Sequence, residues 1–206
     1  WAKANKGRDW NMVLFRDESS LEVCGTDRQV RVSRQSGEAY IPRNMTSTFR
    51  SARQSLMVWA GMSYDFKTPL FRIPLAPSRV ERSTRIRAEG LKAQRYADHI
   101  VKGPLQAAWH ELTMFSVGYQ VVEDNLPCHN GLVAWQAREE VRICCLNHPS
   151  VPPDLNPIEN VWMVLKTRIY RVQPILTSLD ELFMVASRVW NEIEMEIVNG
   201  CVESMP

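Results

Sequence analysis

The feature of this 206-residue chain that most constrains its fold is a nearly continuous apolar run at 56–62, Leu-Met-Val-Trp-Ala-Gly-Met. Such a run is typical of a strand that is covered on both faces, because a strand with one solvated face alternates apolar and polar residues. We therefore expect this segment to lie near the centre of a sheet that has helices on both sides.

The other predicted elements change type along the chain. An apolar run at 11–15 indicates a buried strand, and further strands are expected in these segments: 23–24, 30–32, 39–41, 118–124 and 141–146. Helical spacing of apolar residues predicts helices in these places: from Gly90 to Gly103-Pro104, on through Leu112, over 132–140, from Asn156 and from Ser178. Strands first, then alternating helices and strands, predict an α/β fold with a mixed sheet flanked by helices, in a single domain over 1–206.

Two of these helices have clear start signals. Asn156 is the predicted N-cap of one, with Pro157 at the first helical position and Glu159 at the third, and Ser178 begins a second capping box. The first of these helices has a five-residue apolar stripe: Ile158, Val161, Trp162, Leu165 and Ile169. The last helix is expected to bury Leu182, Phe183, Ala186, Trp190, Ile193 and Ile197.

Three acidic residues stand at notable positions. Asp17 comes just after the strand at 11–15, Asp124 ends the strand at 118–124, and Glu159 lies in the first turn of its helix. Each alone is an ordinary turn or cap residue. If the two strands are sheet neighbours and the helix packs beside them, however, the three carboxylates converge at one edge of the sheet.

Converging carboxylates need positive charge, because unpaired they raise one another's pKa values. Oxygen ligands with few imidazoles suit Mg²⁺ or Mn²⁺. Two such ions can activate a water or hydroxyl and stabilise the leaving oxygen in an in-line displacement at phosphorus. This is the chemistry of nucleases and strand transfer.

Basic residues are concentrated in the first half of the chain. Residues 1–100 carry 18 basic and 10 acidic side chains, whereas 101–206 carry 7 and 13. Two arginine-rich stretches supply the candidates for contact with a DNA backbone: Arg28, Arg31, Arg34, Arg50, Arg53, Arg82, Arg85 and Arg87. An ordinary solvated surface is the alternative for these arginines. No apolar run approaches the ~20 residues of a bilayer span, so no membrane partner is expected.

Four blocks of the sequence resemble the signature blocks of mariner-type transposases of the Tc/mariner superfamily, which are DDE endonucleases. The blocks are Phe-Arg-Asp-Glu-Ser at 15–19, Met-Val-Trp-Ala-Gly-Met-Ser at 57–63, Val-Glu-Asp-Asn-Leu-Pro-Cys-His at 122–129 and Pro-Asp-Leu-Asn-Pro-Ile-Glu-Asn-Val-Trp at 153–162. They occur in the family's order, and 34 residues separate Asp124 from Glu159, as in the branch whose triad is Asp, Asp and Glu. The resemblance implies a ribonuclease H-like catalytic domain.

The resemblance also implies a function. Asp17, Asp124 and Glu159 would hold two Mg²⁺ or Mn²⁺ ions and cut double-stranded DNA at transposon ends, after which the freed 3′ hydroxyl joins a TA target. Such enzymes act in the nucleus, and family members work as dimers. The implied supporting residues are Asn125, His129, Asn156 and Asn160. For His129, a structural hydrogen-bonding role is the alternative to a place beside the metals.

The chain departs from the family pattern at several positions. Relatives usually have Ser where Arg16 stands and Ala where Leu126 stands, and the approach at 148–153 also differs. Because the chain begins directly at Trp1, we expect the helix-turn-helix domains that precede the catalytic domain in the family to be absent. Two alternatives to a DNA-cutting enzyme therefore stay open: an inactive or domesticated remnant that binds DNA or protein, and a ribonuclease H-like nuclease acting on RNA-DNA hybrids.

Overall fold

The computed structural model describes residues 5, 7–23, 55–74, 91–114, 116–124, 126–146, 156–172, 176 and 178–205. Their centre is a six-stranded sheet in the order β3-β2-β1-β5-β6, with β4 also paired to β2. The strands are β1 (Val13–Glu22), β2 (Ser55–Ser63), β3 (Phe66–Lys67), β4 (Phe71–Arg72), β5 (Gln120–Val122) and β6 (Cys145–Leu146). β1 runs antiparallel to β2 and parallel to β5, so the predicted mixed sheet is confirmed.

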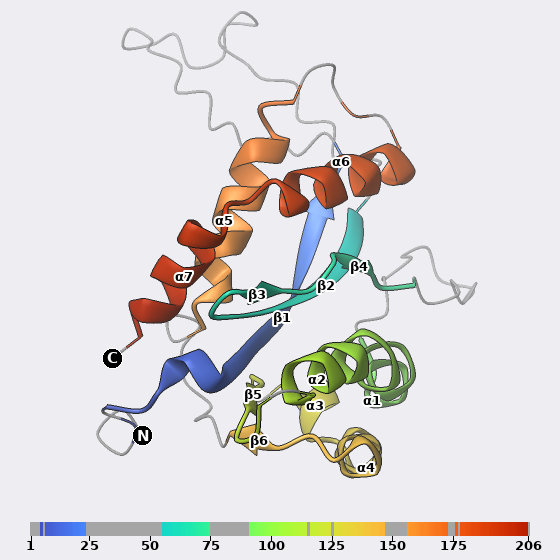
Figure 1. The fold of residues 1–206 in the computed structure, drawn as a ribbon. Coiled ribbons are helices and arrows are strands. Elements are labelled where there is room, and N and C mark those ends of the chain that lie inside the picture. Colours follow the sequence, from blue (N-terminus) through green and yellow to red (C-terminus); the bar gives the residue numbers. More distant parts are fainter. Residues whose placement is uncertain are drawn as a thin grey trace, which may run out of the picture.

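One face of the sheet is covered by three helices, α5 (Ile158–Ile169), α6 (Leu179–Asn191) and α7 (Met195–Glu203), as Figure 1 shows. Val13, Phe15 and Val58 of the sheet face this layer, and the whole predicted stripe of α5 is buried in the same core. The predicted cap of α6 is also present, because Ser178 Oγ accepts a hydrogen bond from Glu181 N at 3.1 Å. Apolar side chains at helical spacing thus hold this layer to the sheet.

The opposite face is covered by a second layer of helices (Figure 1). Its elements are α1 (Ala93–Tyr96), the π-helical η3 (Ala97–Leu105), α2 (Gln106–Thr113), α3 (Pro127–Asn130) and α4 (Leu132–Val141). Leu14, Trp59 and Val121 project into this layer from β1, β2 and β5. Because Leu14 lies between Val13 and Phe15, which face α5, consecutive residues of β1 serve the two cores in turn. The short 3₁₀ helix η1 (Trp10–Met12) leads into β1.

The predicted strand at 56–62 is confirmed as β2, whereas the predicted end of the first strand is wrong. β1 continues past Phe15 to Glu22, because its ladder with β2 runs on from Phe15↔Met62 to Glu22↔Ser55. Asp17 therefore lies inside a strand, opposite Ala60. The expected strands at 30–32 and 39–41 lie outside the described residues.

The predicted helix end at Gly103-Pro104 is confirmed as a kink, because Gly103 has non-helical backbone angles inside η3, and the second predicted helical stretch continues as α2. Two other predicted boundaries differ. The last predicted helix is two helices, and Lys67 Nζ donates to the carbonyl oxygens of Trp190, at 2.7 Å, and Ile193 where they separate. The strand expected at 141–146 is confined to β6, since α4 includes Val141. Among the described residues, no helix combines the length and apolarity that crossing a bilayer requires.

Candidate active site

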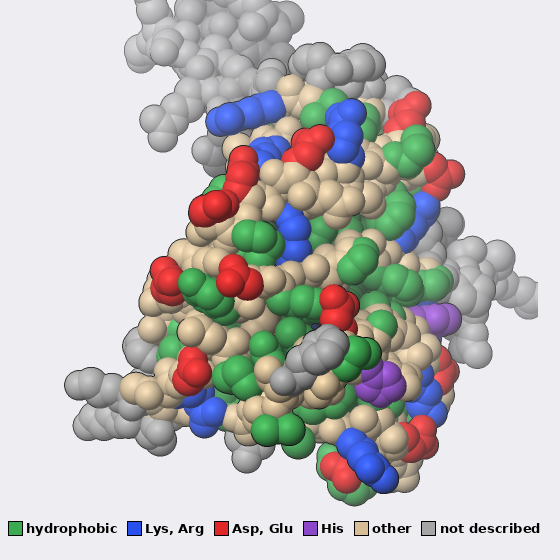
Figure 2. All heavy atoms as spheres, in the orientation of Figure 1, with side chains coloured by type: hydrophobic (Ala, Val, Ile, Leu, Met, Phe, Trp, Pro, Cys, Tyr) green, Lys and Arg blue, Asp and Glu red, His purple; other side chains and the backbone are tan. Residues whose placement is uncertain are grey.

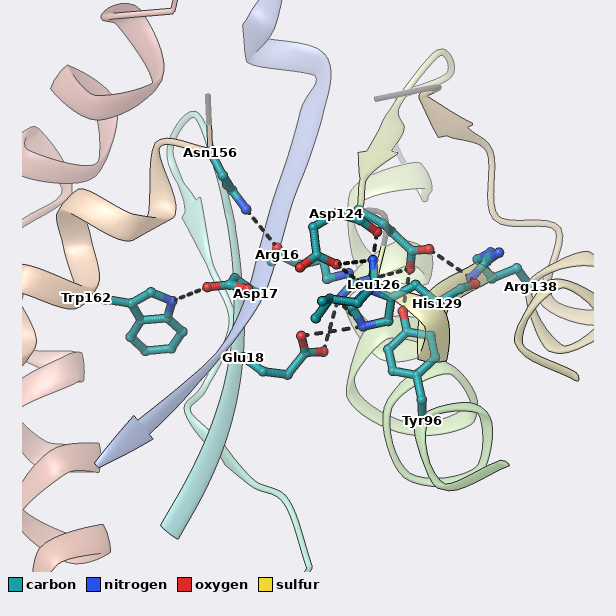
Figure 3. Close-up of polar contacts among 11 residues, drawn as sticks. Arg16, Asp17, Glu18, Tyr96, Asp124, Leu126, His129, Arg138, Asn156 and Trp162 are labelled. Carbon is teal, nitrogen blue, oxygen red and sulfur yellow. Dashed lines mark hydrogen bonds and ion pairs between the residues drawn. The ribbon is translucent and has the colours of Figure 1, made fainter. Parts of the chain in front are cut away.

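The candidate site is built on β1, where side-chain alternation sends Asp17 to one face of the sheet and Arg16 and Glu18 to the other. Asp17 shares its face with Val13 and Phe15 and points toward α5, as Figure 3 shows. Arg16 and Glu18 point toward α3 and α1. One short stretch of strand thus supplies groups to two different environments.

Asp17 is half-buried against α5. Trp162 Nε1 donates a hydrogen bond to Asp17 Oδ2 at 3.1 Å. Burial, followed by the nearby charges of Glu18 and Glu159, raises the pKa of Asp17 from 3.8 to about 7. Within the described ranges, no Lys, Arg or His forms an ion pair with Asp17 or Glu159.

Glu159 lies exposed in the first turn of α5, as predicted. The predicted capping box is wrong. Pro157 is the N-cap, and Asn156 Nδ2 instead donates to the backbone oxygen of Arg16 at 3.2 Å, because the start of α5 packs against β1. Asn156 Oδ1 is left buried without a hydrogen-bond partner among the described residues. Asn160 is exposed in the same turn.

Asp124 follows β5 by two residues, close to its predicted position. His129 of α3 is fully buried and contacts Asp124 Oδ1 through Nδ1. Burial raises the pKa of Asp124, but the hydrogen bond and charge of His129, with Arg16, outweigh burial and lower it. Burial and Arg16 lower the pKa of His129, yet its hydrogen bonds, with Asp124 foremost, raise it to about 11.

A group of buried charged residues occupies the same side of β1 as His129. We call it the ionic cluster, and its members are Arg16, Glu18, Glu123, His129 and Arg138. Arg16 Nη1 donates to Glu18 Oε1 at 2.9 Å, and Arg16 Nη2 lies 2.9 Å from Glu123 Oε1. Arg138 Nη1 lies 2.8 Å from Glu123 Oε2. The guanidinium of Arg16 also lies 5.0 Å from the ring centre of Tyr96.

Sequence reasoning missed most of the ionic cluster. The strand predicted at 11–15 leaves Arg16 and Glu18 outside the sheet, and Trp162 was predicted only as part of an apolar stripe. Alternation along a longer β1 would have shown that Arg16 and Glu18 share a face with buried Leu14. Glu123 and Arg138 have no such local signal, because their partners lie elsewhere in the chain.

The structure brings together two of the three predicted acids. Asp17 and Glu159 share the α5 side of β1, while Asp124 is hydrogen-bonded to His129. In the described part of the chain, no three His, Cys, Asp or Glu side chains form a group that could hold a metal ion. The donors on the α5 side nevertheless suit a hard cation, since the oxygens are carboxylate and amide oxygens and the buried Asn156 Oδ1 lacks a donor.

Nine other predicted residues lie outside the described part of the chain: Asn125 and the eight arginines expected at the DNA backbone. Figure 2 shows one face of the molecule, on which the described Lys, Arg, Asp and Glu side chains are interspersed. A cavity of about 770 Å³ opens beside Asp124, with Trp135, Arg138 and Glu139 among its lining residues.

Comparisons with known sequences agree on one group of proteins. Residues 88–182 match the family model of the DDE superfamily endonucleases. The whole chain aligns with the transposable element Tc1 transposase of Caenorhabditis elegans, at 28% identity over 211 residues that cover 70% of that protein. The Tcb1 transposase of Caenorhabditis briggsae is 29% identical over 213 residues, again covering 70% of its length.

Solved structures show a similar fold over the whole chain. The catalytic domain of Mos1 mariner transposase matches with a TM-score of 0.66 at 12% identity, covering 82% of that chain. The same catalytic domain with Raltegravir and Mn matches with a TM-score of 0.67, covering 83%. A Mos1 transposase paired-end complex with the left transposon end gives 0.72 at 13% identity, covering 55%. The predicted ribonuclease H-like mixed sheet is therefore confirmed.

Proposed function

Because this chain belongs to the Tc1/mariner transposases, enzymes of the DDE endonuclease superfamily, we propose that it cuts transposon-end DNA with divalent metal ions and joins the freed 3′ hydroxyl to target DNA. The observation that carries this proposal is the state of Asp17. It is a half-buried carboxyl whose pKa is raised to about 7 by burial, Glu18 and Glu159, and no described cation pairs with it. A carboxylate in this environment gains most from a bound cation.

The residues of the site have separate tasks in this proposal. Asp17, Glu159 and Asp124 would hold Mg²⁺ or Mn²⁺. Bound ions would lower the pKa of the attacking water or 3′ hydroxyl and stabilise the leaving oxygen. Trp162 orients Asp17 through its hydrogen bond, and His129 keeps Asp124 ionised and oriented.

The partners follow from the same proposal. The substrate is double-stranded DNA, at transposon ends and at a TA target, and the work is done by a homodimer in the nucleus. The similar structure of a Mos1 transposase paired-end complex with a transposon end supports DNA as the substrate. The similar structures of the Mos1 catalytic domain with Mn and with Mg support divalent metal ions as the cofactors. The arginines at 28–53 and 82–87 are proposed to contact phosphates.

A nicking assay tests the proposal. Supercoiled DNA is incubated with the protein and Mg²⁺ or Mn²⁺, and open-circle product is measured for wild type, Asp17→Asn, Asp124→Asn and Glu159→Gln. We expect each substitution to lower the rate at least ~100-fold, because loss of a ligand costs more than loss of a group behind it. A pre-cut end with a free 3′ hydroxyl, offered a TA-containing target, tests joining in the same way.

The matched control is Glu196→Gln. Glu196 lies exposed in the first turn of α7, as Glu159 does in α5, so the two substitutions make the same chemical change in the same kind of position. Glu196→Gln is expected to nick at the wild-type rate. If wild type and all variants produce the same nicking, or none, the chain is a remnant that has lost catalysis. Preferential cutting of RNA-DNA hybrids would instead support a ribonuclease.

A further inference from the structure

We infer that Arg16 and Glu123 are a positioning pair, which keeps Asp17 of β1 level with Asp124, two residues after the neighbouring strand β5. The inference rests on the proposed function, because it concerns the placement of two proposed metal ligands. Each member of the pair directly precedes one of these acids in the sequence.

The need for such a pair arises where the backbone ladder stops. β1 and β5 are paired from Val13↔Gln120 to Phe15↔Val122, and no further backbone pair joins them among the described residues. The next residues in this parallel register are Arg16 beside Glu123, and then Asp17 beside Asp124. Beyond Phe15, side-chain contacts therefore take over from backbone hydrogen bonds in holding the two segments together.

The contact between the pair is short and buried. Arg16 Nη2 lies 2.9 Å from Glu123 Oε1, and the two side chains are 1% and 9% exposed. This contact is an ion pair without hydrogen-bond geometry, since Nη2 has no hydrogen-bond partner among the described residues. A buried pair of this kind contributes little net stability compared with apolar residues, but it favours one relative placement of its two segments.

Glu123 is anchored from the other side as well. Tyr96 of α1 donates its hydroxyl to Glu123 Oε1, and Arg138 Nη1 of α4 lies 2.8 Å from Oε2. Arg138 Nη1 also donates to the backbone oxygen of His129 at 2.9 Å. Glu123 thus connects β1, α1 and α4 at the residue before Asp124, so a change at Glu123 reaches Asp124 directly along the backbone.

The test compares Glu123→Gln with Glu140→Gln. Gln keeps the shape of the side chain and removes its charge. Glu140 on α4 forms an exposed ion pair with Lys102 at 2.6 Å, so its substitution removes a charge from the same layer without touching the ionic cluster. The first measurement is hydrogen exchange of the metal-free protein. The second is the affinity for Mn²⁺, measured by electron paramagnetic resonance at a temperature below that of unfolding.

We expect amides at 14–17 and 121–124 to exchange at least ~10-fold faster in Glu123→Gln, with no change in α6 and α7. Mn²⁺ affinity should fall ~10- to 100-fold, the range typical of groups that orient a ligand. Glu140→Gln should match wild type in both measurements. If Glu123→Gln does not fold, Arg16→Lys, which keeps the charge but reaches fewer carboxylate oxygens, is measured instead with the same expectations.

Two results would overturn the inference. One is wild-type exchange at the ends of β1 and β5 in the variant. The other is faster exchange with unchanged Mn²⁺ affinity, which would make the pair structural only. If wild type itself binds no Mn²⁺ in a manner that depends on Asp17, the proposed metal chemistry fails, and hydrogen exchange alone then decides whether the pair aligns the two strands.

Discussion

Carboxylates lie on both sides of β1 at Arg16, Asp17 and Glu18, but the two sides differ in whether a cation of the protein lies beside them. On the α3 and α4 side, each buried carboxylate of the ionic cluster has a cation of the protein beside it. On the α5 side, Asp17 and Glu159 have no such partner among the described residues, and the pKa of Asp17 rises to about 7. Residues one position apart in the sequence thus lie on two different sides of the strand. We call them the neutralised side, where each carboxylate has a counterion, and the charge-deficient side, where the carboxylates lack a positive counterion among the described residues.

This difference distinguishes a structural site from a binding site. Buried charges that are already paired contribute to the placement of elements and leave little for a ligand to gain. Carboxylates without a counterion raise one another's pKa values and so favour any cation that enters. The same strand can therefore be rigid on one side and ready to bind on the other.

The largest expected effect comes from breaking the neutralised side. Arg16→Met leaves Glu18 and Glu123 buried without their shared cation, and we expect the free energy of unfolding to fall by about 3 to 5 kcal/mol. Denaturant unfolding at pH 7 measures this loss. The control Arg188→Met removes an exposed arginine 3.9 Å from Glu192, and it should unfold like wild type. Equal stability of both variants would show that the ionic cluster is not coupled to folding.

A metal ion should stabilise the charge-deficient side. At a concentration of Mn²⁺ 100 times its dissociation constant, the free energy of unfolding should rise by about 2.7 kcal/mol at pH 8. The gain should be much smaller at pH 5.5, because Asp17, with its pKa of about 7, keeps its proton there and the ion has to displace it. Thermal unfolding with and without Mn²⁺ measures both values. An equal gain in stability at the two pH values would contradict the claim that the ion competes with a proton on Asp17.

Removing the charge of Asp17 should stabilise the metal-free protein. The folded pKa is about 7 and the ordinary value 3.8, so the folded state holds a proton that the unfolded chain has lost between these pH values. The contribution of Asp17 to stability therefore falls as pH rises from about 4 to about 7. We expect Asp17→Asn to be about 2 kcal/mol more stable than wild type at pH 8 and nearly equal at pH 4. Gln120→Asn, an amide substitution on β5, is not expected to show this pH dependence.

The smallest effect concerns the coupling of the two acids. Glu159→Gln removes one of the charges that raise the pKa of Asp17, so that pKa should fall by less than about one unit. Carboxyl carbon shifts of Asp17, followed by NMR through a pH titration, measure the change. Glu196→Gln should leave the titration where it is in wild type. An unchanged pKa in Glu159→Gln would mean that the two acids do not sense each other.

The fold was largely predictable because its signals are local. The apolar run at 56–62 became β2, the stripe of α5 is buried throughout, and Ser178 caps α6. The end of β1 was not predictable in this way. Arg16 and Glu18 look like turn residues until the cations and carboxylates that accompany them in the folded protein are known.

The candidate site was predictable in its acids and less so in its arrangement. Asp124 and Glu159 lie close to where spacing placed them, and Asp17 lies inside its strand instead of after it. The prediction of Asn156 as the N-cap was wrong because its side-chain amide donates a hydrogen bond to the backbone of β1, a contact across 140 positions of sequence. The roles of the three acids in metal binding and catalysis stay predictions.

By itself, the sequence determined which residues lie on the same face of an element, because side-chain alternation and helical periodicity depend only on order along the chain. Only the tertiary structure decided what each face meets. Trp162 reaches Asp17 from 145 positions away, and Arg16 meets His129 across 113. The charge state of a carboxyl depends on burial and on neighbours within a few ångströms, and those neighbours come together only when distant segments pack.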